Sequence, residues 1–158
     1  MAEHISVDLD LLFPLIQDKL SSGGDIMFGP KGVSMMPLIR QGIDSVKISP
    51  VTGRLKKYDV PLYRRKNGQF VLHRIVGVYK DSYVMCGDNQ CIREKGITDD
   101  MIIGIMTEII KPEGTIKITD KNYINYSKNQ VRKQHLKYFI WRIKAFIKRI
   151  LIKLQLYK

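Results

Sequence analysis

The 158-residue chain is poor in cysteine and histidine, and it contains no long uncharged apolar run. No stretch reaches the roughly 18 apolar residues that a membrane-spanning helix needs. The two cysteines, Cys86 and Cys91, are not spaced as CxxC, and no second Cys or His pair is placed to complete a zinc site. We therefore expect two reduced thiols, with a short disulfide as the alternative, and we predict neither a metal nor another cofactor.

The N-terminus lacks the features of a secretory signal peptide. It begins Met-Ala-Glu-His, without a basic start, an apolar run and a small-residue cleavage site. Together with the lack of a spanning run, this composition predicts a cytoplasmic protein that is at most peripheral to a membrane.

Acidic residues are missing from the last part of the chain. Residues 131–158 contain nine basic residues and no acid, so residues 1–130 hold the other 18 basic and all 15 acidic residues. The first 130 residues therefore carry only +3 of the total net charge of +12. The charge is concentrated in a tail, which points to an anionic partner for that segment.

Apolar residues make up 44% of the chain, enough for one packed domain. Leu11 to Leu20 has the apolar spacing of a short helix, which Asp8 could cap and Gly23-Gly24 could end. Short β-prone runs separated by turn signals follow. They are Ile26–Phe28, Ser45–Ile48, Val60–Tyr63, Gln69–Tyr79, Ser82–Met85, Met101–Ile110 and Thr115–Ile118. This pattern predicts a mainly β fold, a coiled antiparallel β-domain or partial barrel.

We divide the chain into four segments on this basis. Residues 1–24 form the N-terminal helix and its lead-in, 25–118 the β-rich domain, 119–130 a polar linker, and 131–158 a long basic amphipathic helix. Such a helix, with interfacial aromatics, is typical of one that lies in a membrane surface. Its candidate membrane-surface residues are Arg132, Lys133, Lys137, Trp141, Arg142, Lys144, Lys148 and Arg149. The alternatives are that its apolar face packs on the β-domain or, less favoured, that its basic face binds nucleic acid.

Ser34 is a candidate nucleophile. It lies in Gly32-Val33-Ser34-Met35-Met36-Pro37, a turn that follows a short strand. Such a turn can project the hydroxyl while the backbone N–H groups of Gly32 and Ser34 face the same cavity, where they could hold an oxyanion. The same residues also suit a plain turn.

His73 is the candidate base among three histidines. His4 lies near the N-terminus and His135 in the basic helix, whereas His73 lies in a β-prone run between Leu72 and Arg74. Strand alternation places His73 on a face with Val71 and Ile75, where an imidazole must be hydrogen-bonded. A core histidine bonded to a carbonyl is the alternative. A third group usually orients such a base, and Asp88, Glu94 and Asp99-Asp100 are all candidates.

The order of these motifs resembles the type I signal peptidase family and the related SOS-repressor autoproteases. The resemblance rests on Ser34-Met35-Met36-Pro37, Tyr58–Tyr63, His73–Gly77, Gly87-Asp88-Asn89 and Ile102–Met106, and covers roughly residues 25–110. A His-Arg pair at the base position is similar to the archaeal and endoplasmic-reticulum signal peptidases. The resemblance implies the family's coiled β fold, Ser34 as nucleophile, His73 as base, Asp88 as the third member, and Glu94 where the family often has a second acid.

Two departures from the family pattern affect the functional expectation. Gly32 stands where signal peptidases often have a serine that donates to the oxyanion, and the N-terminal membrane anchor is missing.

We expect a serine endopeptidase that acts on a peptide or protein at a membrane surface. A self-cleaving regulator is an alternative, although the roughly 30 residues before Ser34 are too few for a helix-turn-helix domain and linker. A catalytically inactive membrane-surface binding module is the other alternative.

Overall fold

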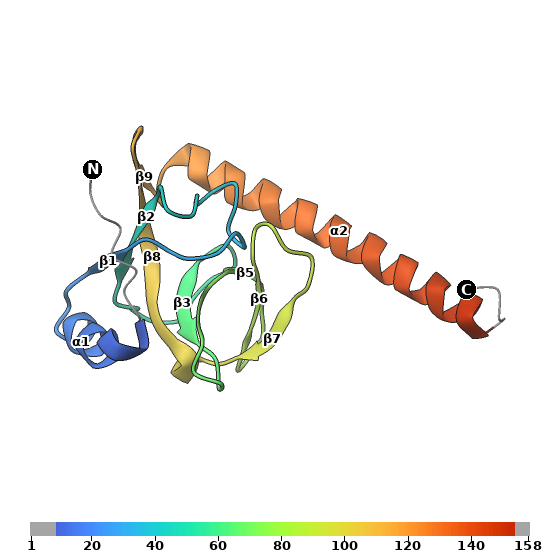
Figure 1. The fold of residues 1–158 in the computed structure, drawn as a ribbon, viewed down its shortest axis with the longest axis horizontal. Coiled ribbons are helices and arrows are strands. Elements are labelled where there is room, and N and C mark those ends of the chain that lie inside the picture. The colour runs from blue at the N-terminus through green and yellow to red at the C-terminus, as the bar shows by residue number, and fades with distance from the viewer. Residues whose placement is uncertain (1–8, 154–158) are drawn as a thin grey trace.

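In the computed structural model, which describes residues 9–153, short antiparallel strands curl into a half-barrel flanked by a short and a long helix (Figure 1). The larger sheet has the order β1-β2-β8-β3-β4, with β9 also paired to β8, and the smaller sheet has the order β5-β6-β7. The expected mainly β fold with a helix at each end of the chain is confirmed. The strands are β1 (Ile26–Phe28), β2 (Ser45–Ser49), β3 (Pro61–Arg64), β4 (Phe70–Leu72), β5 (Arg74–Val78), β6 (Tyr83–Cys86), β7 (Glu94–Ile97), β8 (Ile102–Lys111) and β9 (Gly114–Lys117).

Irregular pairing bends the sheets. The register shifts between Lys47 and Ile48 in the β2–β8 pair, and between Leu62 and Tyr63 in the β3–β8 pair. A bulge of this kind increases local twist and turns a strand away from the sheet plane. The ten-residue β8 therefore pairs with β2 and β9 along one part and with β3 along another, and it holds the half-barrel together.

The predicted single strand Gln69–Tyr79 is two strands that belong to different sheets. β4 pairs with β3 and β5 pairs with β6, and His73 is the residue between them. Residues 71–76 are all buried, so both faces of this segment are covered and simple alternation does not apply. The Asn67-Gly68 step makes the β3–β4 turn, with Gly68 at a φ of +90°. Strand β7 was not predicted, because its Glu94-Lys95-Gly96 segment is polar and poor in β-formers.

Helix α1 (Leu9–Ser21) begins before the predicted Leu11, and Gly23 follows its end with a φ of +82°, as expected. Ile16 and Leu20 are buried, but Leu11 is 81% exposed. Phe13 also packs edge to face on Phe70 of β4, so the helix contacts the sheet through Phe13, Ile16 and Leu20. Asp8, the proposed cap, lies outside the described residues.

Helix α2 (Lys121–Lys153) begins ten residues before the predicted Val131, so the expected linker 119–130 is wrong. After the turn at Asp120, the polar segment is the first part of the helix. Its polar groups bind a buried ion pair of the β-domain: Tyr123 and Ser127 meet Arg74, and Tyr126 meets Asp88. Polar side chains that have buried partners stabilise a docked helix, and a hydropathy pattern does not reveal such partners.

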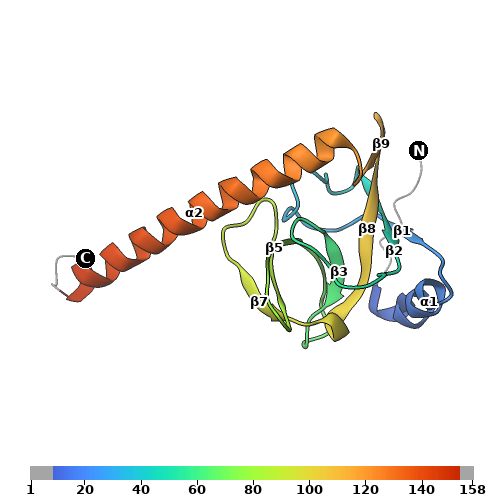
Figure 2. The same cartoon turned by 180° about the vertical axis from the view of Figure 1, so that it is seen from behind.

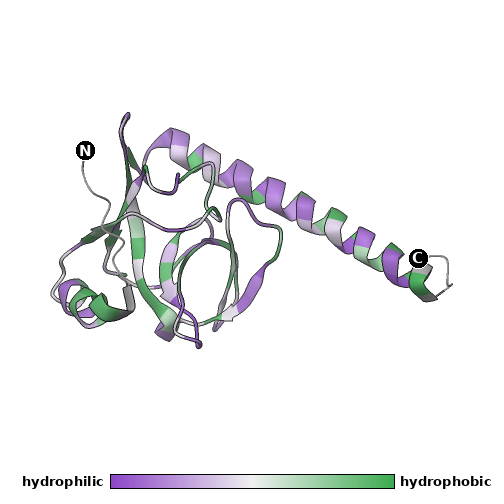
Figure 3. Ribbon diagram, in the orientation of Figure 1, coloured by the Kyte–Doolittle hydropathy of each residue, from purple (hydrophilic) through white to green (hydrophobic). Residues whose placement is uncertain are grey.

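The outer part of α2 projects from the domain (Figures 1 and 2). From Phe139 onward nearly every described side chain is exposed, including Phe146 at 65%. The hydropathy colouring shows that apolar and polar residues alternate along this free portion (Figure 3). The alternative that its apolar face packs on the β-domain is therefore wrong. Within residues 9–153, no helix is apolar over a sufficient length to cross a membrane.

Candidate active site

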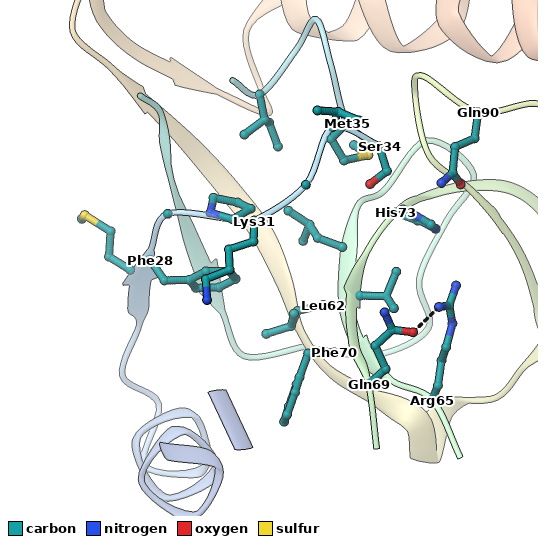
Figure 4. Close-up of a pocket in the computed structure, with 18 residues that line it drawn as sticks. Phe28, Lys31, Ser34, Met35, Leu62, Arg65, Gln69, Phe70, His73 and Gln90 are labelled. Atoms are coloured by element: carbon teal, nitrogen blue, oxygen red, sulfur yellow. Dashed lines mark hydrogen bonds between the residues drawn. The ribbon is translucent and has the colours of Figure 1, made fainter. Parts of the chain in front are cut away.

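An open cavity of about 960 Å³ lies between the two edges of the larger sheet, β1 and β4. The loop after β1 and the end of β4 line it, so Ser34 and His73, which are 39 positions apart in the chain, share one cavity. Figure 4 shows Ser34, His73 and Gln90 gathered at one end, with Phe28 and Phe70 at the other. Two unpaired strand edges that face a common cavity can accept an extended chain.

The turn at Ser34 is held from behind by the turn after β6. Asn89 donates its backbone N–H to the Ser34 carbonyl at 2.7 Å and its side-chain amide to the Val33 carbonyl at 3.3 Å. A methyl group on Gly87 would lie 2.7 Å from the Ser34 carbonyl oxygen, which is too close for any side chain. Gly87 and Asn89 thus position the half-buried Ser34, and Gly87 has to be a glycine because of close approach.

Gly32 does not serve as the expected oxyanion donor in this arrangement. Its N–H donates to the Gln41 side-chain oxygen at 2.9 Å, and its φ of +94° requires a residue without a Cβ. The Gly32 N–H is therefore already hydrogen-bonded within the loop and is not available to an oxyanion. The Ser34 N–H is the donor that stays a candidate for an oxyanion.

His73 is 5% exposed and contacts a residue that the sequence did not single out. Its Nδ1 lies 3.4 Å from the Tyr63 hydroxyl oxygen, and the two rings meet edge to face. Tyr63 donates its single hydroxyl proton to the Glu94 carboxylate at 2.7 Å. The Tyr63 oxygen can then only accept from His73, so the contact favours the tautomer with the proton on Nδ1 and a free lone pair on Nε2.

Arg65 closes this chain of contacts at the β4 side of the cavity. It donates from Nε and Nη2 to the two Glu94 oxygens at 2.7 and 2.6 Å. Burial raises the pKa of Glu94, but the hydrogen bonds from Arg65 and Tyr63 outweigh that effect and leave the pKa below its usual value. Glu94 is therefore a carboxylate at neutral pH and can accept both bonds.

Burial and, after it, the nearby Arg65 charge lower the pKa of His73 to about 4, against the opposing effects of Glu94 and Asp88. The imidazole is thus neutral at pH 7, which is the state that can accept a proton. A base of such low pKa is weak, because proton transfer is most efficient when the pKa lies near the working pH. Within residues 9–153, no hydrogen bond joins the Ser34 hydroxyl to His73.

Asp88, the expected third member of a triad, is committed elsewhere. Both of its oxygens accept from Arg74 at 2.8 Å, and Tyr126 adds a bond at 3.1 Å. The Arg74 and Asp88 side chains are both fully buried. Asp88 therefore anchors the turn behind Ser34 to helix α2, and Glu94 is the acid that is linked to His73, through Tyr63.

Sequence reasoning missed Tyr63, Arg65 and the anchoring role of Asp88. The position of Tyr63 next to His73 depends on the β3–β4 register, in which Tyr63 faces Val71. The Asn-Gly turn signal could have supplied that register. The sequence did not show which of the two acids, Glu94 or Asp88, lies near His73. Glu94 begins β7, and this strand was not predicted, so its position beside β6 was not foreseen.

The two cysteines are free, as expected, and Cys86 is buried while Cys91 is exposed. Burial raises the pKa of Cys86 to about 11, so it is a thiol at neutral pH and a poor nucleophile. The Cys86 thiol therefore does not compete with the Ser34 hydroxyl, whereas the exposed Cys91 lines a second pocket together with His73.

Seven of the eight candidate membrane-surface residues are cations whose side chains are exposed along α2. The eighth, Trp141, is 51% exposed and stacks on Tyr138 with the ring centroids 6.0 Å apart. Tyr138 in turn lies under Arg93 of the β-domain, at 4.1 Å. Trp141 thus lies on the side of the helix that continues the docked face.

No protein-family model, curated protein or solved structure matches this chain.

Proposed function

We propose that this chain is a serine-type endopeptidase of the signal peptidase kind, with Ser34 as nucleophile and His73 as general base. The observation that carries the proposal is that Ser34 and a neutral His73 with an oriented tautomer line one cavity between two free strand edges. The sequence resemblance to Ser/His signal peptidases adds to it.

In the first step, Ser34 Oγ attacks the peptide carbonyl carbon and its proton passes to His73 Nε2. The oxyanion is stabilised by the Ser34 N–H. The C–N bond then breaks, the amine leaves with the proton from Nε2, and an acyl ester on Ser34 is left. Water attacks this ester with His73 as base again, the C–Oγ bond breaks and Ser34 regains its proton.

Tyr63 and Glu94 act as positioning residues in this scheme. As Nε2 gains a proton, the Nδ1–H bond to Tyr63 strengthens, and the Glu94 charge favours the imidazolium. Ser34 and His73 must approach one another for the transfer, and catalytic hydrogen bonds often tighten only when substrate fills the site. An extended peptide added beside β1 or β4 is the substrate shape that this cavity suits.

A peptide mixture analysed by mass spectrometry tests the proposal. We expect internal cleavage by the wild type, none by Ser34→Ala, and loss of at least about a hundredfold in rate for His73→Ala. Ser82→Ala, which changes a serine outside the cavity, serves as the matched control. Cleavage that persists in Ser34→Ala would contradict the assignment.

A binding module without activity is the second candidate. Two observations favour it: no hydrogen bond joins Ser34 to His73 among the described residues, and the low pKa of His73 makes it a weak base. Failure of all variants, wild type included, to cleave any peptide would support this candidate over the enzyme.

A further inference from the structure

The outer part of α2 carries an exposed apolar stripe. Leu136, Phe139, Ile143, Phe146, Ile147 and Ile150 recur at intervals of three and four residues, so they share one face of the helix. Each is between 41% and 65% exposed. A contiguous apolar face of this length is unusual on the surface of a soluble domain and indicates a partner.

This stripe faces away from the β-domain. The docked side of α2 runs through Ser127, Gln130 and Gln134. The Ser127 hydroxyl accepts from Arg74, and the Gln130 and Gln134 amides donate to the Asp88 and Gly87 carbonyls. Leu136 is two residues after Gln134, which places it about 200° around the helix, on nearly the opposite side. The docked side combines these polar groups with the buried Val131, which packs on Val76, Val84 and Cys86. The β-domain thus covers that side of the helix and leaves the apolar stripe on the other side exposed.

Cations border the stripe along both sides. By helical spacing, Lys137 and Lys144 lie along one border, and Arg142 and Arg149 lie along the other. All four are exposed, and the helix contains no acidic residue. The long basic side chains can extend sideways to lipid phosphates while the apolar side chains enter the acyl region.

The charge pattern discriminates among occupants. A second copy of the helix would bring cationic borders against cationic borders, which repel. A nucleic acid would leave the apolar stripe in water. An anionic bilayer meets both the stripe and its borders.

We propose that residues 136–150 lie in the plane of an anionic membrane surface, with the β-domain held on the opposite side of the helix, away from the bilayer. Membrane binding by residues 136–150 does not depend on the peptidase chemistry. The docked part of the same helix does contact the candidate active site, since Gln130 and Gln134 bind the turn that supports Ser34. Membrane binding would therefore place the proposed enzyme at a membrane surface, and only this last statement rests on the proposed function.

Sedimentation of the full chain with vesicles tests the proposal. Vesicles of phosphatidylcholine with roughly a third phosphatidylglycerol should bind the protein, and pure phosphatidylcholine vesicles should bind it far less. Raising the salt from about 0.1 to about 0.5 M should weaken binding, because the cationic contribution is screened. The salt series separates an anionic surface from a purely apolar one.

Matched variants test the orientation. Ile147→Asp and Ile150→Asp change the stripe, whereas Ile152→Asp makes the same charge change at a 53% exposed position on the opposite side. We expect the two stripe variants to bind about tenfold more weakly than Ile152→Asp. Circular dichroism checks that all three remain helical.

Several outcomes would overturn the proposal. They are equal binding by all three variants, no binding to anionic vesicles, salt-resistant dimers in sedimentation equilibrium, and binding to nucleic acid that exceeds binding to vesicles. Vesicle binding without peptide cleavage would leave this proposal standing while the proposed enzymatic function fails.

Discussion

Tyr63 has a single hydroxyl proton, and Glu94 receives it at 2.7 Å. That commitment makes the Tyr63 oxygen an acceptor toward His73 and favours the tautomer that frees Nε2 for Ser34. The orienting acid of the candidate site thus acts through an intermediate phenol. The family resemblance implied a pair between His73 and Asp88, but both Asp88 oxygens accept from Arg74, and no hydrogen bond joins Asp88 to His73 within residues 9–153.

The pH dependence of any Ser34 reaction should report the unusual environment of His73. With a pKa of about 4, His73 is neutral and active from mildly acidic pH upward, and its activity should fall only as the pH drops through that value. Arg65→Gln removes a positive charge that disfavours the imidazolium, so the fall should move to higher pH. The measurement is the rate of Ser34 acylation by a serine-reactive probe across the acidic range.

Lys66→Gln is the control for that series, because Lys66 is an exposed cation in the adjacent turn. An equal movement of the acidic limb in both variants would mean that general charge, and not the Arg65–Glu94–Tyr63 contact chain, sets the His73 pKa. The account would also be contradicted if the activity of the wild type fell near the ordinary pKa of a histidine, well above 4.

The turn at Gly87-Asp88-Asn89 and the first half of α2 behave as one structural unit. Asp88 binds Arg74, Tyr126 binds Asp88, and Gln134 donates to the Gly87 carbonyl at 2.7 Å. On the other side of the turn, Asn89 holds the Ser34 loop. The helix is therefore connected to the nucleophile through this turn, in which Gly87 and Asp88 are buried and Asn89 is exposed.

Removing one charge of this buried pair should be costly. Asp88→Asn leaves Arg74 with an uncompensated buried charge, and the free energy of unfolding should fall by about 3–5 kcal/mol. Urea denaturation measures it, with the exposed Asp81→Asn as the control. A stability loss as small as that of the control would mean that Asp88 is free for another role, including orientation of His73.

Element prediction from the sequence succeeded where local signals were strong. The β-prone run Ser45–Ile48, the Asn67-Gly68 turn and the glycines after α1 each correspond to an observed feature. It failed at residues 121–130, because these polar residues are helical owing to partners from distant parts of the chain. It failed at residue 73 for the same reason, since the change of sheet there depends on long-range pairing.

At the level of the whole molecule, the sequence predicted a curled β-domain and identified Ser34 and His73 as a candidate nucleophile and base. The structure places both in one cavity. The choice among the acids and the direction of the apolar stripe of α2 could not be predicted, because each depends on which face of an element packs against the domain. Three-dimensional contacts decide those points, and a linear pattern leaves them open.

The most direct test of the account is the mass of a covalent adduct. The purified full chain is treated at neutral pH with an acylating or phosphonylating serine probe, and the modified residue is located by peptide mapping. The account predicts one adduct, on Ser34, that is absent in Ser34→Ala and much slower in both His73→Ala and Tyr63→Phe. No adduct at Ser34, or an adduct whose rate is indifferent to His73, would contradict the assignment of Ser34 and His73 as a catalytic pair.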